Sequence, residues 1–183
     1  MKMLLKLLIV LLGAYMAPLH ADEYSDATAN FRQAPTTQPF FQNAYGYAIF
    51  PTVGKGGFVV GGAYGEGRVF RGGAQIGDVS LLQVNIGWQL GGQTYSEIIF
   101  FQDKKAFDTF TSGSFSFGAQ ASAVAIAIGA SAQAGSNGSS ANAGNQQSES
   151  LYTLGMAVFT MTKGGLMYEA SIGGQKFSYN ARQ

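Results

Sequence analysis

The pattern of hydrophobic and polar residues divides the chain into three parts. Residues 4–17 are almost wholly apolar, residues 22–43 are polar and mixed, and from residue 44 onward short apolar runs alternate with glycine-rich turns. Short runs rich in aromatic and β-branched residues and bounded by glycine are typical of strands. The pattern therefore predicts a mainly β domain over 44–183, a β-rich α+β fold. Its antiparallel strands would form either two sheets or one curled, barrel-like sheet, with one or two short helices.

The clearest strand candidate is residues 80–90, where apolar and polar residues alternate with a period of two. The apolar residues take the even positions, namely Leu82, Val84, Ile86, Trp88 and Leu90. Such alternation is typical of a strand with one face in the core and the other in solvent. We therefore expect the even positions to be buried and Gln83 to face solvent.

Glycine and proline predict where the other strands begin and end. Pro51 is expected to stop a strand that begins near Tyr45, and residues 65–67 are expected to form a hairpin turn. The glycine pair at 61–62 indicates a bulge or a close backbone approach. Residues 163–165 are expected to form the turn of a C-terminal hairpin, which a polar tail follows.

Three short segments favour helices. The first is expected to end before Pro35, and the second contains Pro39 near its first turn. The third spans 103–110, where Asp103 can cap the helix N-terminus. Residues 22–43 are thus expected to form a helical or irregular segment that precedes the sheet.

Two further segments are less regular. Residues 115–128 favour strand structure, with an alanine-rich helix as the alternative. Residues 132–150 consist mainly of Gly, Ser, Ala, Asn and Gln, a composition that cannot bury a core. This second segment is therefore predicted to be a flexible loop inside the domain.

The first 21 residues have the pattern of a secretory signal peptide. Lys2 opens the segment, an apolar run follows at 4–17, Pro18 ends it, and Ala21 offers a small residue for cleavage. The apolar run is shorter than the roughly 20 residues that a membrane-spanning helix needs. We therefore expect export to the periplasm or the medium, with peripheral association with the outer membrane as a further option.

The composition excludes several classes of chemistry. The chain has no cysteine, and its single histidine, His20, would leave with the signal peptide. Ser-His-Asp catalysis, Cys-His catalysis and zinc sites built on Cys or His then lack their residues. The 11 basic and 10 acidic residues create no overall field that would attract nucleic acid. We therefore expect no enzymatic activity, no cofactor, no metal site and no nucleic-acid partner.

A few basic residues are candidates for binding an anionic lipid headgroup. Lys55 and Lys163 each directly precede a Gly-Gly pair, where exposed backbone N–H groups can help to hold an anion. Arg68 and Arg71 follow Lys55 in the sequence and are expected to lie near it. Phe58 is a candidate apolar anchor beside them, with core packing as its alternative role.

Three carboxylates are candidates for a catalytic role. Glu66, Glu97 and Glu169 show no spacing typical of a pair of catalytic carboxylates around a cleft. Their expected roles are structural: capping, protection of a strand edge, or a salt bridge to Arg68 or Arg71.

Four segments of the chain resemble the SYLF domain family, which has lipid-binding and actin-binding members. They are AYGYAIFPTVGKGGFVVGGAYGEGRVF at 44–70, GDVSLLQVNIGWQLGGQTYSEIIFF at 77–101, FDTFTSGSFSFGAQASAVA at 107–125 and KGGLMYEASIGGQKFSY at 163–179. Their order and spacing cover nearly all of the chain from residue 44. The chain is most similar to the exported bacterial branch, whose members are described as lipid-binding.

The resemblance implies binding to lipid or to an anionic membrane surface of the cell envelope, without enzymatic activity. Eukaryotic members bind phosphoinositide membranes partly through a basic N-terminal helix, but residues 22–37 here hold three acidic residues and one arginine. An exported protein also meets no actin, so actin is not an expected partner. The alternative is a structural or interaction protein of the envelope that has no lipid ligand.

Overall fold

The computed structural model describes residues 22–56, 60–86, 93–118, 125–128, 151–164 and 174–182. The predicted signal peptide, Phe58, Trp88, Glu169 and the predicted loop at 132–150 lie outside the described residues. The described elements are α2 (Asp22–Gln33), α3 (Gln38–Asn43), β1 (Gly46–Gly56), β2 (Val60–Arg71), β3 (Ala74–Ile86), β4 (Gln93–Phe101), α4 (Lys104–Phe110), β5 (Ser114–Ser116), β6 (Ala125–Ile128), β7 (Met156–Gly164) and β8 (Gln175–Ala181).

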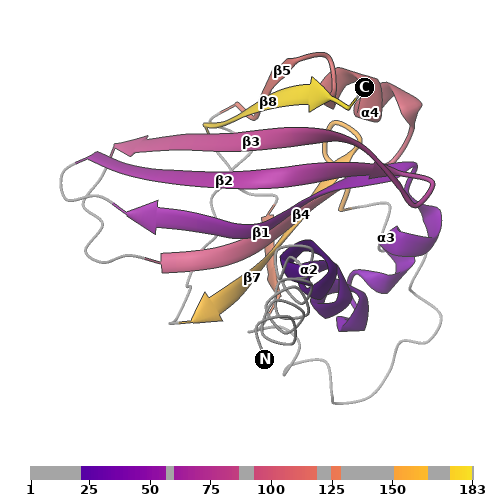
Figure 1. Cartoon of the computed structure of the whole chain (residues 1–183), viewed down its shortest axis with the longest axis horizontal. Helices are drawn as coiled ribbons and strands as arrows, with labels where there is room; N and C mark the ends of the chain where they lie inside the picture. The colour runs from indigo at the N-terminus through magenta and orange to yellow at the C-terminus, as the bar shows by residue number, and fades with distance from the viewer. Residues whose placement is uncertain are drawn as a thin grey trace, which may run out of the picture.

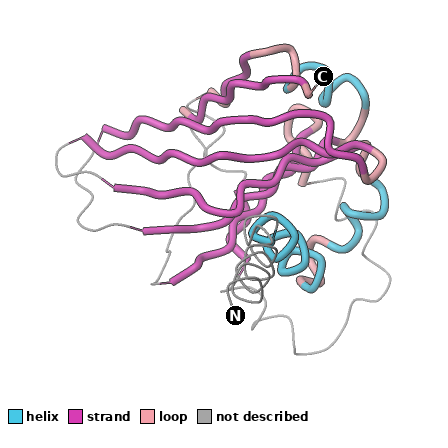
Figure 2. Tube along the Cα trace, in the orientation of Figure 1, coloured by secondary structure: helices cyan, strands magenta, loops and turns pink. Residues whose placement is uncertain are grey.

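The described strands form one sheet in the order β5-β8-β3-β2-β1-β4-β7-β6 (Figures 1 and 2). Neighbouring strands are antiparallel except for β6, which runs parallel to β7 at one edge. The β-rich α+β prediction is therefore confirmed, and the single curled sheet replaces the two-sheet alternative. The described part contains three helices, which match the three segments that favour helices in the sequence.

The sheet curls into a half-barrel, and one side-chain contact demonstrates the curl. Gln175 Nε2 of β8 donates a hydrogen bond to Glu97 Oε2 of β4 at 2.9 Å. Three strands separate β8 from β4 in the sheet order, so a flat sheet would hold them roughly 19 Å apart. Phe177 of β8 and Phe50 of β1 also meet across the interior, with ring centroids 5.8 Å apart.

The interior is packed with aromatic side chains, and α4 covers one end of it. Phe50, Phe101, Phe110 and Phe177 are all at most 1% exposed. Phe110 of α4 lies against both Phe101 and Phe177, with centroid distances of 4.8 and 5.0 Å. Asp103 caps α4, because its side chain accepts a hydrogen bond from the Ala106 backbone N–H at 2.8 Å, as the sequence predicts.

A second core lies on the outer face of the sheet, beneath α2 and α3. Phe31 and Phe40 of this helical segment are buried against Ile98, Phe100 and Phe159. The Phe40 and Phe159 rings meet edge to face with centroids 4.8 Å apart. The helices predicted before Pro35 and around Pro39 are therefore confirmed, and together they cover the outer face of β1, β4 and β7 (Figure 1).

The predicted orientation of β3 is wrong at the residues that test it. Leu81 and Gln83 are fully buried, whereas Leu82 is 52% exposed. The odd positions face the half-barrel interior, where Gln83 lies directly opposite Gln175 of β8. Gln83 is therefore buried beside a polar residue of β8, a strand that is distant in sequence but adjacent in the sheet.

The predicted turn at 65–67 is also wrong, because β2 runs unbroken through these residues. The turn between β2 and β3 lies instead at Gly72 and Gly73. Both residues have a positive φ, of 57° and 82° respectively. Position 67 has no room for a side chain. A Cβ there would lie 2.6 Å from the Phe50 ring and 2.9 Å from the Ile49 carbonyl oxygen, which explains the glycine, Gly67.

One further strand boundary differs from the prediction. β1 continues through Pro51, and a shift in its pairing register there absorbs the proline. At the glycine pair 61–62 the second predicted alternative, a close backbone approach, is confirmed. Pairing is regular there, and the Gln83 carbonyl oxygen lies 3.2 Å from where a Cβ of Gly62 would be.

The C-terminal region also pairs differently from the prediction. β8, which was expected to be a polar tail, pairs with β3 and β5. β7 pairs with β4 and β6, and the second arm of the predicted hairpin lies outside the described residues. The strand interpretation of 125–128 is confirmed over the helical alternative.

A cluster of polar side chains is buried inside the half-barrel. Glu97, Thr160 and Gln175 are fully buried, and Glu97 Oε1, Thr160 Oγ1 and Gln175 Oε1 have no hydrogen-bond partner among the described residues. Burial raises the pKa of Glu97 to about 7, and the hydrogen bond from Gln175 opposes this shift. The predicted roles of Glu97 in capping, edge protection or ion pairing are therefore wrong.

The raised pKa makes stability depend on pH through Glu97. The folded protein holds the Glu97 proton more tightly than the unfolded chain, so this contribution is full below about pH 4.5 and is lost as the pH rises through 7. Glu97→Gln removes the titration while keeping a hydrogen-bond acceptor for Gln175. Between pH 5 and pH 8 the free energy of unfolding of the wild type should fall by about 2–3 kcal/mol relative to the variant. Urea denaturation at several pH values measures this difference, and parallel pH profiles would contradict the assignment.

Close packing at Gly67 predicts a position-specific cost of adding one methyl group. Gly67→Ala should lower the free energy of unfolding by about 1–3 kcal/mol, because the new Cβ overlaps the Phe50 ring and the Ile49 carbonyl. Gly54→Ala in the neighbouring strand is the matched control, since a Cβ there meets nothing within 4 Å. Equal urea midpoints for the two variants would show that the packing at Gly67 is looser than described.

Candidate functional site

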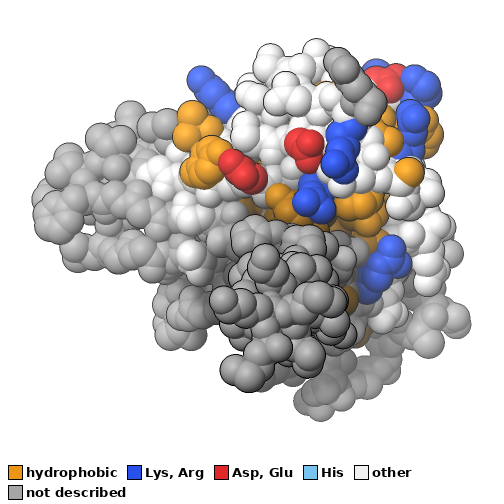
Figure 3. Space-filling view, in the orientation of Figure 1, with side chains coloured by type: hydrophobic (Ala, Val, Ile, Leu, Met, Phe, Trp, Pro, Cys, Tyr) orange, Lys and Arg blue, Asp and Glu red, His pale blue; other side chains and the backbone are white. Residues whose placement is uncertain are grey.

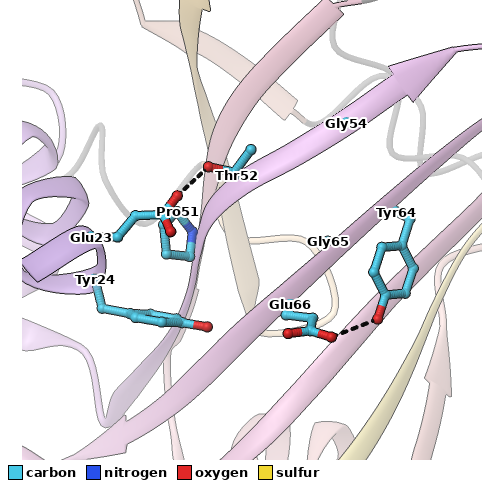
Figure 4. Close-up of a pocket in the computed structure, with 8 residues that line it drawn as sticks. All are labelled: Glu23, Tyr24, Pro51, Thr52, Gly54, Tyr64, Gly65 and Glu66. Atoms are coloured by element: carbon cyan, nitrogen blue, oxygen red, sulfur yellow. Dashed lines mark hydrogen bonds between the residues drawn. The ribbon is translucent and has the colours of Figure 1, made fainter. Parts of the chain in front are cut away.

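Two cavities lie side by side on the outer face of the sheet, where α2 crosses β1 and β2. The first, here called the cationic cavity, has a volume of about 390 Å³ and is lined by Tyr24, Ser25, Thr28, Ala29, Arg32, Tyr47, Arg68, Phe70 and Gln75. The second, the acidic cavity, has a volume of about 340 Å³ and is lined by Glu23, Tyr24, Pro51, Thr52, Gly54, Tyr64, Gly65 and Glu66 (Figure 4). Tyr24 belongs to both linings and so marks the boundary between them.

Helix periodicity creates one wall of the cationic cavity. Tyr24, Thr28 and Arg32 are spaced four residues apart, which places them along one stripe of α2. The neighbouring stripe carries the buried Ala27 and Phe31, which fix the helix on the sheet. The amphipathic pattern of α2 therefore directs Arg32 towards the strand that carries Arg68.

Both guanidinium groups of the cationic cavity rest on aromatic rings. The Arg68 Cζ lies 3.9 Å from the centroid of the Tyr24 ring, and the Arg32 Cζ lies 4.3 Å from that of Phe41. Burial raises the pKa of Tyr47 and of Tyr24, while Arg32 and Arg68 respectively oppose these shifts.

Neither guanidinium of the cationic cavity forms an ion pair with another described residue. Within the described ranges there is one salt bridge, between Lys104 and Asp108 on α4. Asp78 is the cross-strand partner of Arg68, yet its carboxylate instead accepts a hydrogen bond from Gln75 Nε2 at 2.9 Å. Two arginines with unpaired charge therefore line one cavity, a donor set that suits phosphate or carboxylate oxygens.

The acidic cavity brings two carboxylates and two tyrosines together. Glu23 of α2 accepts a hydrogen bond from Thr52 Oγ1, and Glu66 accepts one from the Tyr64 hydroxyl at 2.9 Å. The hydrogen bond to Glu66 raises the pKa of Tyr64. Figure 4 shows the Glu66–Tyr64 pair across from the Glu23–Thr52 pair, with the Tyr24 ring extending from α2 towards Glu66.

Lys55 and Lys163 lie at the same end of the sheet, as far as the backbone shows. Lys55 is paired with Gln93 of β4, and the next residue of that strand, Thr94, is paired with Gly164 of β7. One strand, β4, therefore separates the two lysine positions. Their side chains lie outside what the structure describes.

The expectation that Arg68 and Arg71 lie near Lys55 is wrong. Lys55 is paired with Ala63, whereas Arg68 and Arg71 are paired with Ile49 and Gly46, towards the other end of β1. Because β2 is extended, the five steps along the strand from Ala63 to Arg68 span roughly 17 Å.

Arg71 does not line either cavity. Its Cζ lies 5.6 Å from the ring centroid of Phe107 of α4, at the end of β2. Arg68 is thus the one predicted residue that the described structure places in a cavity with a second cation. That second cation, Arg32, was missed, although its spacing from Tyr24 on one helix stripe could have revealed it.

An exposed row of side chains crosses the sheet beside the acidic cavity. Tyr64 is paired with Leu82, and Leu82 is paired with Lys176 of β8. Tyr64 and Leu82 are 53% and 52% exposed, and Lys176 is also exposed. Basic, acidic and hydrophobic side chains are interspersed on the face shown in Figure 3, so any attraction of an anion there is local.

Two properties of the described residues define the site further. No group of three or more His, Cys, Asp or Glu side chains in these ranges could hold a metal ion. None of the helices within these ranges is long and apolar enough to span a bilayer.

Comparison with known proteins identifies the family. Residues 82–182 match the model of the family described as Las17-binding protein actin regulator, Ysc84. The chain is also 26% identical over 150 residues to Beta cell expansion factor A of Aeromonas veronii, a match that covers 80% of this chain and 50% of that protein. The chain thus spans about half the length of this curated relative. Because the family model covers more than half of the chain, from β3 to β8, the chain belongs to the Ysc84 family of SYLF-domain proteins.

Proposed function

We propose that this protein is an exported, non-enzymatic protein that binds lipid at the membrane surface of the cell envelope. The observation that carries the proposal is the cationic cavity, where Arg32 and Arg68 line one concavity and neither forms an ion pair with a residue that the structure describes. A guanidinium group presents several N–H donors in a planar fork that matches phosphate oxygens. The phosphate of a lipid headgroup is therefore the ligand group that this cavity fits best.

The strength of such binding follows from the number of cations. Each basic residue close to an anionic bilayer contributes about 1 kcal/mol, and salt screens exposed charges over about 8 Å at physiological ionic strength. After removal of the signal peptide the chain would hold nine basic and ten acidic residues, so net charge would not help. We expect weak, salt-sensitive binding that depends on local placement of charge.

The exposed row of Tyr64, Leu82 and Lys176 lies on the same face of the sheet as the two cavities. This face would therefore be the one that meets the membrane. Tyr64 and Leu82 would contact the apolar side of the interface, and Lys176 would remain among the headgroups. The family description refers to binding of Las17 and regulation of actin, and the name of the Aeromonas relative refers to beta cell expansion. We do not extend these partners to this chain, because we propose that it is exported.

Binding to vesicles tests the role of the cationic cavity. The wild type should bind vesicles that contain phosphatidylglycerol, and binding should weaken as sodium chloride is added. The Arg32→Gln/Arg68→Gln double variant should bind roughly 30-fold more weakly, since two contributions of about 1 kcal/mol are lost. Co-sedimentation across a range of lipid concentrations measures the change.

Two further variants identify the surface involved. Lys105→Gln removes an exposed cation of α4 and should leave binding unchanged. Lys55→Gln/Lys163→Gln tests the other end of the sheet, and a loss with this variant alone would move the site there. Absence of wild-type binding to any lipid vesicle would favour the alternative, an envelope interaction protein without a lipid ligand.

The proposed export predicts a defined mature N-terminus. Mass spectrometry of the protein from the periplasm or the medium should find Asp22 as the first residue, because cleavage is expected after Ala21. A protein that retains Met1 and stays in the cytoplasm would contradict the proposed location.

A further inference from the structure

The two cavities carry opposite charge and share a wall. Glu66 and Arg68 are two residues apart on the same face of β2, so their Cα atoms are roughly 7 Å apart. Glu66 lines the acidic cavity, Arg68 lines the cationic cavity, and Tyr24 belongs to both. A positive and a negative region thus lie next to each other on one small area of the sheet.

Glu66 and Arg68 each contact a tyrosine rather than each other. The Glu66 carboxylate accepts a hydrogen bond from Tyr64, and the Arg68 guanidinium rests on the Tyr24 ring, but Glu66 and Arg68 do not form a salt bridge. An exposed ion pair would satisfy each charge with the other. Here each charge remains available to a group of opposite sign on a ligand.

The walls of the acidic cavity suit an organic ammonium group rather than a metal ion. Tyr24, Tyr64 and Pro51 supply apolar and aromatic surface, and Glu23 and Glu66 supply negative charge. Carboxylates combined with aromatic rings are the usual environment of alkylammonium ligands. A cavity of about 340 Å³ is within the size range of small-molecule sites.

We propose that the acidic cavity binds the ammonium group of a zwitterionic ligand whose phosphate lies in the cationic cavity. The ligand class is a phosphate joined to an ammonium group by a short spacer, as in phosphocholine and phosphoethanolamine. The phosphate half of this assignment rests on the proposed function, whereas the ammonium half rests on the acidic cavity alone. The same chemistry occurs in phospholipid headgroups and in the free phosphoesters.

The test uses soluble probes on the mature protein, so that it does not depend on vesicle binding. Choline probes the acidic cavity, methyl phosphate probes the cationic cavity, and phosphocholine probes both. Isothermal titration calorimetry or ligand-observed NMR measures each dissociation constant. Phosphocholine should bind more tightly than either of the single-charge probes.

Glu66→Gln is the decisive variant, because the amide oxygen can still accept the hydrogen bond from Tyr64. It should weaken choline and phosphocholine binding about tenfold and leave methyl phosphate binding unchanged. Arg68→Gln should do the reverse: weaken methyl phosphate and phosphocholine and leave choline unchanged. Asp78→Asn is the matched control, since it removes an exposed carboxylate opposite Arg68 that lines neither cavity; its choline affinity should equal that of the wild type.

The possible outcomes separate this proposal from the proposed function. Absence of choline binding to the wild type, or equal choline affinity in Glu66→Gln, overturns the ammonium site even if vesicle binding is normal. Loss of vesicle and methyl phosphate binding with choline binding intact overturns the proposed function and keeps the ammonium site. Competition of free phosphocholine with phosphatidylcholine vesicles would identify the lipid headgroup as the source; tight phosphocholine binding without vesicle binding would identify the free phosphoester.

Discussion

The hydrogen bond between Gln175 and Glu97 expresses the constraint on which the rest of the structure depends: the first and second halves of the sheet must meet across its interior. These residues belong to strands with three others between them, so the contact exists only in a curled sheet. Curling gives each strand an inner and an outer face with different neighbours. It therefore decides that Gln83 is buried and that Leu82 is exposed, against the hydrophobic pattern of β3.

The placement of the candidate site follows from how the outer face is covered. α2 and α3 bury Ile98, Phe100 and Phe159. α2 packs mainly on β1 and meets β2 through the contact of its Tyr24 ring with Arg68. Beyond β1, the even positions of β2 remain at the surface, and they alternate between acid and base at Glu66 and Arg68. The cavities thus form at the edge of the area that the helices cover. There the polar side chains line a concave surface that solvent still reaches.

Local signals allowed correct prediction of the local structure. Asp103 capping of α4 and the helices around 22–43 depend on residues within a few positions of each other, so the sequence alone reveals them. The orientation of β3 depends on Gln175, 92 positions later than Gln83 in the chain, and no local pattern carries that information. The site shows the same division: Arg68 was recognised as a candidate, but its ring partner Tyr24 and the second cation Arg32 come from a helix distant in sequence.

The packing of the interior bears on where a lipid can bind. In the part of the chain that the structure describes, Phe50, Phe101, Phe110 and Phe177 fill the space between the curled strands and α4, and their rings contact one another. Displacing such rings to admit an acyl chain would cost several kcal/mol of packing for each ring moved. Contacts on the outer face need no such rearrangement, because the cavities beside α2 and the exposed Tyr64–Leu82 pair are already formed. Among the described residues, the geometry therefore favours the outer face over the interior as the place of the proposed headgroup binding.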